Sequence, residues 1–437
     1  MVYYPVDAVE VLAWGKRVGA VALDPGLGYY VFEYYPEFAA TGVELAPGTM
    51  PANGGPYVFP QLPEATFHRL PALLADALPD DFGNALIDAW LARQGIRRAD
   101  ITPLDRLAYM AGRGMGALEF RPSRGPRHRT SSAVELGDLV GGARSMLSGE
   151  FAGDRETEAA IQSLIQVGTS AGGARAKAVI AWNRETGEIR SGQLPADEGF
   201  EYWLIKLDGV GLDTELGAGG QYGRIEYAYH LMAVASGIEM TECMLLEENG
   251  RAHFMTRRFD RTATGGKVHS LTLCGMAHLD FRQRGTHDYA QYFQVIDDLG
   301  LGPDAREQAF RRMVFNVLAR NCDDHTKNLS FVLDENGTWA LSPAYDVTYA
   351  YNPNGEWTYQ HLMSVNGVFA GIGIDDLLAV ADRAMVPRPR AVIAEVAAAV
   401  ARWQEFASEA GVDEKWVAEI SATYPELPGT GAPAATR

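Results

Sequence analysis

The spacing of hydrophobic and polar positions changes several times along the chain. Up to about residue 40, β-branched and aromatic residues alternate with polar ones, as in Val9-Glu10-Val11, and Pro and Gly turns separate the runs. Alternation with a period of two is typical of half-buried strands. The pattern therefore predicts a small sheet at the start of the chain.

From about residue 70 the apolar positions follow helical spacing instead. The segment LPALLADALPDDFGNALIDAWLARQG repeats Leu, Ala, Ile and Trp at helical intervals. Asp80 and Asp81 are suited to begin a helix there, and Gly95 is suited to end it. The basic, Pro- and Ser-rich residues 121–132 are typical of a linker or exposed loop. We expect an α+β unit over residues 1–150.

Strand-like segments return in the middle of the chain. AVIAW at 178–182 and YWLIKL at 202–207 flank a turn-forming segment, and a helix is expected from about Gly223. A further strand pair turns at Asn249-Gly250, the strongest short hairpin signal in the sequence. These elements predict a second unit over residues 151–262.

Helical spacing dominates beyond residue 285. One apolar stripe lies within residues 310–318, and a second runs through AVIAEVAAAVARWQEFASEAG near the end. We expect a helical lobe over residues 263–423. The composition of residues 424–437 predicts a disordered tail.

Composition and charge narrow the class of protein. The chain has 437 residues, of which 47% are hydrophobic, which suffices for a large core in two or three domains. Its formal net charge of −18 repels nucleic acid, so contact with DNA would require a basic partner. A DNA-binding protein acting alone is not expected.

The cysteines and the hydropathy of the chain indicate the cellular compartment in which the protein is expected. The three cysteines form no CxxC pair, which argues against a disulfide framework or a thiolate zinc site and fits a reducing cytoplasm. The N-terminus lacks the pattern of a signal peptide, and no apolar run approaches the ~18 residues of a membrane span. We expect a cytoplasmic protein without membrane contact.

The most informative chemistry lies in NCDDHTKNLSFVLDENGTWALSPAYD. Asp323 precedes Asn328 by five positions, and Asp346 follows an expected hairpin. This order is typical of phosphoryl transfer, in which an Asp accepts the hydroxyl proton and a later Asn and Asp hold magnesium ions. Each fragment alone could be a polar turn or a helix cap. Together they favour a kinase.

A kinase also needs a lysine on a strand of its smaller lobe to hold phosphates. Lys206 in YWLIKL is the best candidate, although an edge-strand lysine reaching water would look the same. Glu226, near the start of the next helix, could pair with Lys206, but Glu is also common in first helical turns because of the helix dipole.

The segment GTSAGGARAKA at 168–178 is a Gly- and Ala-rich turn before a strand. Small residues there would let backbone N–H groups approach phosphates, and Arg175 and Lys177 add positive charge. It matches neither GxxxxGK[ST] nor GxGxxG. Ser170 is either a modifiable hydroxyl or a turn residue, and His325 either touches phosphate or Asp323 or makes a structural hydrogen bond.

In combination these motifs resemble the HipA family, the serine/threonine kinase toxins of bacterial type II toxin–antitoxin modules. FEYYPEFAA, LADALPDDFGNALID, SAGGARAK, WLIK, RRFDR, NCDDHTKN and SPAYD occur in the family's order. The resemblance implies an α+β, two-lobed protein-kinase-like fold. It also implies an extra N-terminal subdomain packed on the smaller lobe and an all-helical C-terminal lobe.

The resemblance further implies ATP and Mg²⁺ as cofactors and assigns roles by position. Asp323 corresponds to the catalytic base, Asn328 and Asp346 to the metal ligands, and Ser170 to the autophosphorylated serine. Arg257 to Phe259 correspond to the hinge beside the adenine, and Arg175 replaces the Gln of the best-known members. The expected ATP-binding residues are Ala171, Gly172, Gly173, Ala174, Arg175, Lys177, Lys206, Arg257, Arg258, Phe259, His325 and Lys327.

Family members phosphorylate a serine of an aminoacyl-tRNA synthetase, best known for glutamyl-tRNA synthetase, and so favour persistence. They bind a helix-turn-helix antitoxin of the HipB type and reach operator DNA only through it. Two other classes fit parts of the sequence: a small-molecule phosphotransferase of the aminoglycoside or choline kind, and a non-catalytic co-repressor bound to an antitoxin. The N-terminal 150 residues argue against the first, and the joint presence of Lys206, Asp323, Asn328 and Asp346 argues against the second.

Overall fold

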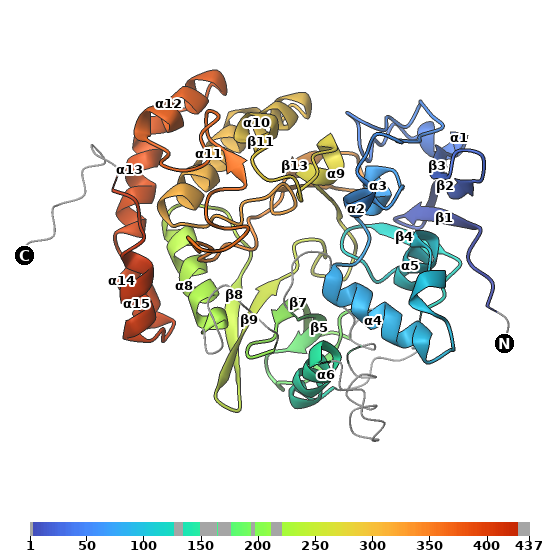
Figure 1. The fold of residues 1–437 in the computed structure, drawn as a ribbon, viewed down its shortest axis with the longest axis horizontal. Coiled ribbons are helices and arrows are strands. Elements are labelled where there is room, and N and C mark those ends of the chain that lie inside the picture. Colours follow the sequence, from blue (N-terminus) through green and yellow to red (C-terminus); the bar gives the residue numbers. More distant parts are fainter. Residues whose placement is uncertain are drawn as a thin grey trace, which may run out of the picture.

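The computed structural model describes residues 3–125, 134–148, 164, 176–193, 197–210 and 221–426. Three parts of the chain are distinguishable in Figure 1. The N-terminal subdomain, in blue and cyan, lies at one end, the helical C-terminal lobe, from yellow to red, at the other, and a small green lobe between them.

The N-terminal subdomain is built on a four-stranded sheet in the order β3-β2-β1-β4, with every pair antiparallel. Its strands are β1 Ala8–Ala13, β2 Lys16–Asp24, β3 Tyr29–Tyr34 and β4 Leu118–Arg121. The alternation in the sequence is reflected in burial, because Val9 and Val11 are both fully buried. The predicted N-terminal sheet is confirmed, and a strand from the far end of the subdomain completes it.

Short helices join β3 to β4. They are α1 Pro36–Ala39, α2 Glu64–Phe67, α3 Ala72–Ala75, α4 Asp81–Ala92, the 3₁₀ turn η1 Arg98–Asp100, and α5 Pro103–Met110. The Asp80 side chain accepts a hydrogen bond from the Gly83 N–H at 2.7 Å and so caps α4. The helix therefore begins where the Asp pair predicts, and it ends at Ala92, shortly before Gly95.

The small lobe is a five-stranded antiparallel sheet in the order β6-β5-β7-β9-β8. Its elements are β5 Lys177–Asn183, β6 Ile189–Ser191, β7 Phe200–Lys206, α8 Tyr222–Ala235, β8 Cys243–Glu248 and β9 Arg251–Arg257. The predicted hairpin at Asn249-Gly250 is confirmed, with φ of 46° and 77° at the two turn residues. Helix α8 packs against β8 and β9.

One hydrophobic core joins the small lobe to the subdomain before it. Phe82 and Leu86 of α4 share this core with Leu139 of α6 (Leu136–Ser148) and with Trp203 and Ile205 of β7. Helix α4 lies between the two sheets in Figure 1. The N-terminal subdomain therefore supplies part of the packing that stabilises the small-lobe sheet.

Helices make up most of the C-terminal lobe. They are α9 Leu273–Ala277, α10 Tyr289–Asp298, α11 Gly302–Leu318, α12 Ile374–Arg383, α13 Pro389–Val400, α14 Trp403–Glu409 and α15 Glu414–Ser421. The apolar stripe within residues 310–318 is buried in α11, as predicted. The second stripe forms two helices, α13 and α14. The chain turns at Ala401-Arg402, and Trp403 then packs against Tyr229 of α8 with ring centroids 5.3 Å apart.

The expectation of an all-helical C-terminal lobe needs correction. The hairpin predicted between Asn328 and Asp346 is present as β12 Ser330–Leu333 and β13 Trp339–Leu341, and β10 His269–Thr272 adds a third antiparallel strand. Pairing with β10 satisfies backbone groups along an edge that the hairpin alone would leave open. Two further short strands, β11 His287–Asp288 and β14 Met363–Ser364, pair in parallel. Across the described ranges no helix is both long and apolar enough to cross a membrane.

Candidate active site

One cavity receives side chains from all three parts of the chain. Asp76, Met115 and Leu118 come from the N-terminal subdomain, and Tyr345 and Val347 from the C-terminal lobe. The predicted site residues that line it are Lys177, Lys206, Glu226, Arg257, Arg258, Phe259, Lys327, Asn328 and Asp346.

Lys206 lies at the end of β7, an inner strand between β5 and β9. Its ammonium contacts the carboxylates of Glu226 and Asp346. The side chain of Glu226 is 1% exposed, so α8 holds this carboxylate inside the protein rather than at a helix surface. The contact between Lys206 and Glu226 therefore joins the small-lobe sheet to α8, and the contact with Asp346 joins it to the C-terminal lobe.

Asp346 follows β13 in a left-handed backbone conformation with φ of 51°, which Asp tolerates better than most residues. Besides contacting Lys206, its carboxylate lies 3.7 Å from the Lys177 Nζ. Desolvation acts to raise the pKa of Asp346, but Lys177 and Lys206 outweigh it and hold the pKa below its usual value. The carboxylate is therefore anionic where it faces the cavity.

Asn328 lines the same cavity. Its Nδ2 donates to the Asp323 carbonyl at 2.8 Å, which leaves Oδ1 as the end able to bind a cation. Mg²⁺ prefers oxygen ligands and usually takes only one or two from the protein, with water and substrate phosphates completing its shell. One amide oxygen and one anionic carboxylate suit that ion.

Asp323 is placed differently from the residues above. Neither Asp323 nor His325 is among the described residues that line the cavity. The Asp323 side chain is 47% exposed, and its Oδ1 lies 3.8 Å from His325 Nε2. The pKa of Asp323 is raised, chiefly by desolvation; nearby His325 opposes this shift, and Asp346 adds to it.

Asp324, the next residue, is buried and was not identified from the sequence. It accepts hydrogen bonds from the Tyr289 hydroxyl at 2.9 Å and the Leu362 N–H at 2.8 Å, and His361 Nδ1 lies 3.0 Å away. Desolvation lowers the pKa of His361, yet Asp324 and Cys322 together outweigh it and raise that pKa to about 10. Asp324 therefore anchors the loop that carries Asp323. The Asp doublet was the only signal for it in the sequence.

The expected hinge residues directly follow or end β9. The Phe259 ring lies 5.7 Å from that of Tyr345, and Arg257 NH2 lies 3.7 Å from a Glu201 oxygen. The Arg258 guanidinium is instead fully buried and bonded to Asp260 at 2.8 and 2.7 Å. A contact between Arg258 and a nucleotide stays a prediction, and its charged group is engaged elsewhere.

His325 and Lys327 both lie near the aromatic ring of Phe281. The His325 ring is 5.3 Å from the ring of Phe281, and the Lys327 ammonium is 4.8 Å from the centre of that ring. The remaining predicted positions fall outside the described residues. These are Ser170, Ala171, Gly172, Gly173, Ala174 and Arg175.

The two lobes, the cavity between them and the order of Asp323, Asn328 and Asp346 along the chain define a protein of kinase-like fold. Comparison with protein families gives the particular class. Residues 9–121 match the HipA N-terminal domain, and residues 169–404 match the HipA-like C-terminal domain. The chain belongs to the HipA family.

Two relatives illustrate the breadth of the family. A putative kinase, Y4dM of Sinorhizobium fredii, is 27% identical over 185 residues, which are 35% of this chain and 39% of the relative. The match thus spans less than half of that protein. A HipA from Shewanella oneidensis MR-1, solved with HipB and operator DNA, superposes with a TM-score of 0.67 at 16% identity. That match covers 95% of both chains. It shows that the two proteins share a fold over nearly their full lengths.

Proposed function

We propose that this protein is an ATP- and Mg²⁺-dependent serine/threonine protein kinase, the toxin of a bacterial toxin–antitoxin module. The observation that carries the proposal is the setting of Asp346. Two lysines, Lys177 and Lys206, keep its carboxylate anionic within a cavity that Asn328 also lines. A charged carboxylate and an amide oxygen beside lysines are the groups that phosphoryl transfer from a nucleotide requires.

In this proposal Lys206 and Lys177 bind nucleotide phosphates, while Glu226 fixes the position of the Lys206 ammonium. Asn328 and Asp346 hold magnesium, which when bound neutralises charge on the transferring phosphoryl group. The apolar part of the cavity, which includes Leu204, Phe259 and Val347, suits a nucleobase.

Asp323 accepts the proton of the acceptor hydroxyl. It shares a loop with Asn328 but is half exposed outside the cavity lining, so an acceptor can reach it from outside while the nucleotide is bound. This placement favours a macromolecular acceptor over a small alcohol that would have to enter the cavity.

For the acceptor we propose a serine of an aminoacyl-tRNA synthetase, such as glutamyl-tRNA synthetase, and for the partner an antitoxin of the HipB type. The Shewanella relative, solved with HipB and operator DNA, supports the second proposal. The chain's net charge of −18 also suits a basic DNA-binding partner. Ser170 is proposed as the site of autophosphorylation.

The test is intact-mass spectrometry of the purified chain after incubation with ATP and Mg²⁺, with Asp323→Asn as the matched variant. We expect one added phosphate in the wild type, mapped to Ser170 by peptide analysis, and none in the variant. Ser170→Ala should lose this phosphate and still phosphorylate a separate protein acceptor.

Other outcomes point to the alternative classes. If labelled phosphate passes to aminoglycosides or choline in preference to proteins, the protein is a small-molecule phosphotransferase. If nucleotide with Mg²⁺ does not bind at all, the kinase proposal fails and a non-catalytic co-repressor is favoured.

A further inference from the structure

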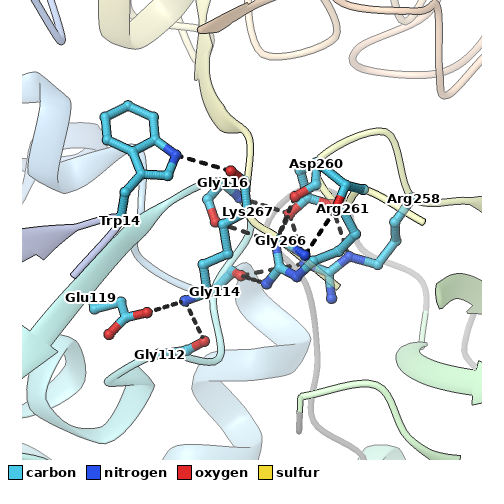
Figure 2. A network of polar contacts seen from close by, with 11 residues as sticks. Trp14, Gly112, Gly114, Gly116, Glu119, Arg258, Asp260, Arg261, Gly266 and Lys267 are labelled. Atoms are coloured by element: carbon cyan, nitrogen blue, oxygen red, sulfur yellow. Dashed lines mark hydrogen bonds and ion pairs between the residues drawn. The ribbon is translucent and has the colours of Figure 1, made fainter. Parts of the chain in front are cut away.

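A buried cluster of three charged side chains lies just after β9 (Figure 2). Asp260 accepts hydrogen bonds from Arg258 Nε at 2.8 Å, Arg258 NH2 at 2.7 Å and Arg261 NH1 at 2.7 Å. The exposed fractions of the Asp260, Arg258 and Arg261 side chains are 0%, 0% and 6%. These three residues are called the Asp260 cluster below.

The cluster binds a loop of the N-terminal subdomain. Gly116 N–H donates to Asp260 Oδ2 at 2.8 Å, and the Gly114 carbonyl accepts from Arg261 at 3.2 Å. Figure 2 shows the loop glycines and the two arginines converging around Asp260. Gly116 has φ of +76°, and a Cβ there would lie 2.9 Å from the Ser270 nitrogen, so the approach needs glycine.

The three side chains of the Asp260 cluster stabilise one another in their charged forms. Desolvation acts to raise the pKa of Asp260, but the two arginines outweigh it and lower that pKa to about 2. Desolvation also lowers the pKa of Arg261 to about 10. Two guanidinium groups and one carboxylate leave a net positive charge, so removal of Asp260 would leave two buried cations without their counterion.

Both segments joined by the cluster also line the nucleotide cavity. Met115, between the two loop glycines, forms part of its wall, and so do Arg257 and Phe259, which directly precede the cluster. Arg258 belongs to both the wall and the cluster. The distance across the cavity between Met115 and Phe259 therefore depends on the contacts of Asp260.

We propose that Asp260 is a positioning residue for nucleotide binding, acting through Arg258, Arg261 and the Gly114–Gly116 loop to set the width of the cavity. The inference rests on the proposed kinase function and deepens it, since it makes the N-terminal subdomain part of the nucleotide site. It concerns affinity and not the transfer step, because Asp323 and Asn328 lie on a different loop.

The interface between the N-terminal subdomain and the segment that follows β9 also contains an ion pair and hydrogen bonds from residues that do not line the cavity. Lys267 Nζ lies 2.9 Å from Glu119 and donates to the Gly112 carbonyl at 3.0 Å, and Trp14 Nε1 donates to the Lys267 carbonyl at 2.9 Å. Glu119, Lys267 and Trp14 are not among the described residues lining the cavity. Glu119→Gln is therefore a control that weakens the interface without touching the wall.

A second control separates positioning from stability. Asp105, also buried, accepts from the Val6 N–H at 3.0 Å and the Thr102 N–H at 2.9 Å, within the N-terminal subdomain. Asp105→Asn should lower the melting temperature but leave nucleotide affinity unchanged. Arg261→Gln is the main variant, because it leaves Arg258 and Asp260 as a neutral pair and is expected to fold, and Asp260→Asn accompanies it.

The experiment uses the full chain and measures Kd for a fluorescent methylanthraniloyl-ADP with Mg²⁺, KM for ATP, and kcat. For Arg261→Gln we expect Kd and KM to rise about fivefold or more while kcat changes less than about twofold, the split expected of lost ground-state binding. Asp260→Asn should show a larger rise. If it does not fold, Arg261→Gln decides.

Wild-type Kd in Arg261→Gln would overturn the inference, and so would an equal rise in Asp105→Asn or Glu119→Gln, which would reveal only general destabilisation. Failure of the proposed function looks different. A wild type that binds the fluorescent nucleotide but never transfers phosphate would refute the kinase and leave the positioning role measurable through Kd. A wild type that binds no nucleotide would refute both.

Discussion

The Lys177 ammonium lies 3.7 Å from the Asp346 carboxylate, on the side of the cavity where Lys206 makes its own contact with that carboxylate. One anion is thereby shared by two cations from neighbouring strands, β5 and β7. In the proposed function, the two lysines would bind a nucleotide phosphate and the carboxylate would bind a magnesium ion.

Asp346→Asn should weaken Mg²⁺-dependent nucleotide binding at least about tenfold, because the substitution removes the carboxylate charge that faces the cation. Calorimetric titration with ADP, with and without Mg²⁺, measures the effect. Asp334→Asn is the matched control. Asp334 lies in the turn of the β12–β13 hairpin, which precedes Asp346, and its carboxylate accepts hydrogen bonds from the Asn336 and Thr338 N–H groups at the surface. Retained magnesium dependence in Asp346→Asn would refute the role.

Asp323→Asn should lower kcat by about 10²- to 10⁴-fold, the usual contribution of a general base, and leave the melting temperature unchanged. The half-exposed side chain makes few contacts that folding depends on. Phosphate transfer in single-turnover conditions, beside thermal unfolding of the same sample, tests both parts. An unaltered rate contradicts the assignment of the base.

Asp324→Asn should do the reverse and mainly destabilise the fold. The carboxylate is the buried partner of a protonated His361, and breaking such a pair costs about 3–5 kcal/mol of unfolding free energy. Urea unfolding of the Asp323 and Asp324 variants side by side gives the comparison. Equal stability of the two variants would contradict a catalytic role for Asp323 combined with a structural role for Asp324.

The His361 pair also predicts how stability changes with pH. The pKa of His361 is about 10 in the folded chain and about 6.5 when unfolded, so its contribution is complete below about pH 6.5 and is lost as pH rises toward 10. Unfolding free energy should fall across this window with a slope of at most about 1.4 kcal/mol per pH unit for this group. His361→Gln should flatten the profile between pH 6.5 and 9.5, and an unchanged slope would contradict the pairing.

Much of the candidate site was predictable because its information is local. Asp323, Asn328 and the hairpin before Asp346 lie in one short segment, and the apolar neighbours of Lys206 identify its strand. The Asn249-Gly250 turn and the Asp80 cap are likewise set by adjacent residues. Short-range patterns of this kind predict the structure correctly where the local preferences agree with the tertiary contacts.

The rest depended on contacts between distant segments. No local feature distinguishes Asp324, whose partner His361 lies in another loop, from Asp323 beside it. The bond between Gly116 and Asp260 joins residues 144 positions apart, and β4 reaches back to pair with β1. Strand β10, which makes the C-terminal lobe more than helical, also needs a partner far along the chain.

Helix α4 carries a consequence for synthesis of the chain. Its apolar residues Phe82 and Leu86 pack against Trp203 and Met255, which are translated much later. The nascent N-terminal subdomain therefore emerges from the ribosome with an apolar surface that the small-lobe sheet does not yet cover, a state in which chains aggregate readily. Chaperones that shield such surfaces should bind the growing chain until the small-lobe sheet has been translated.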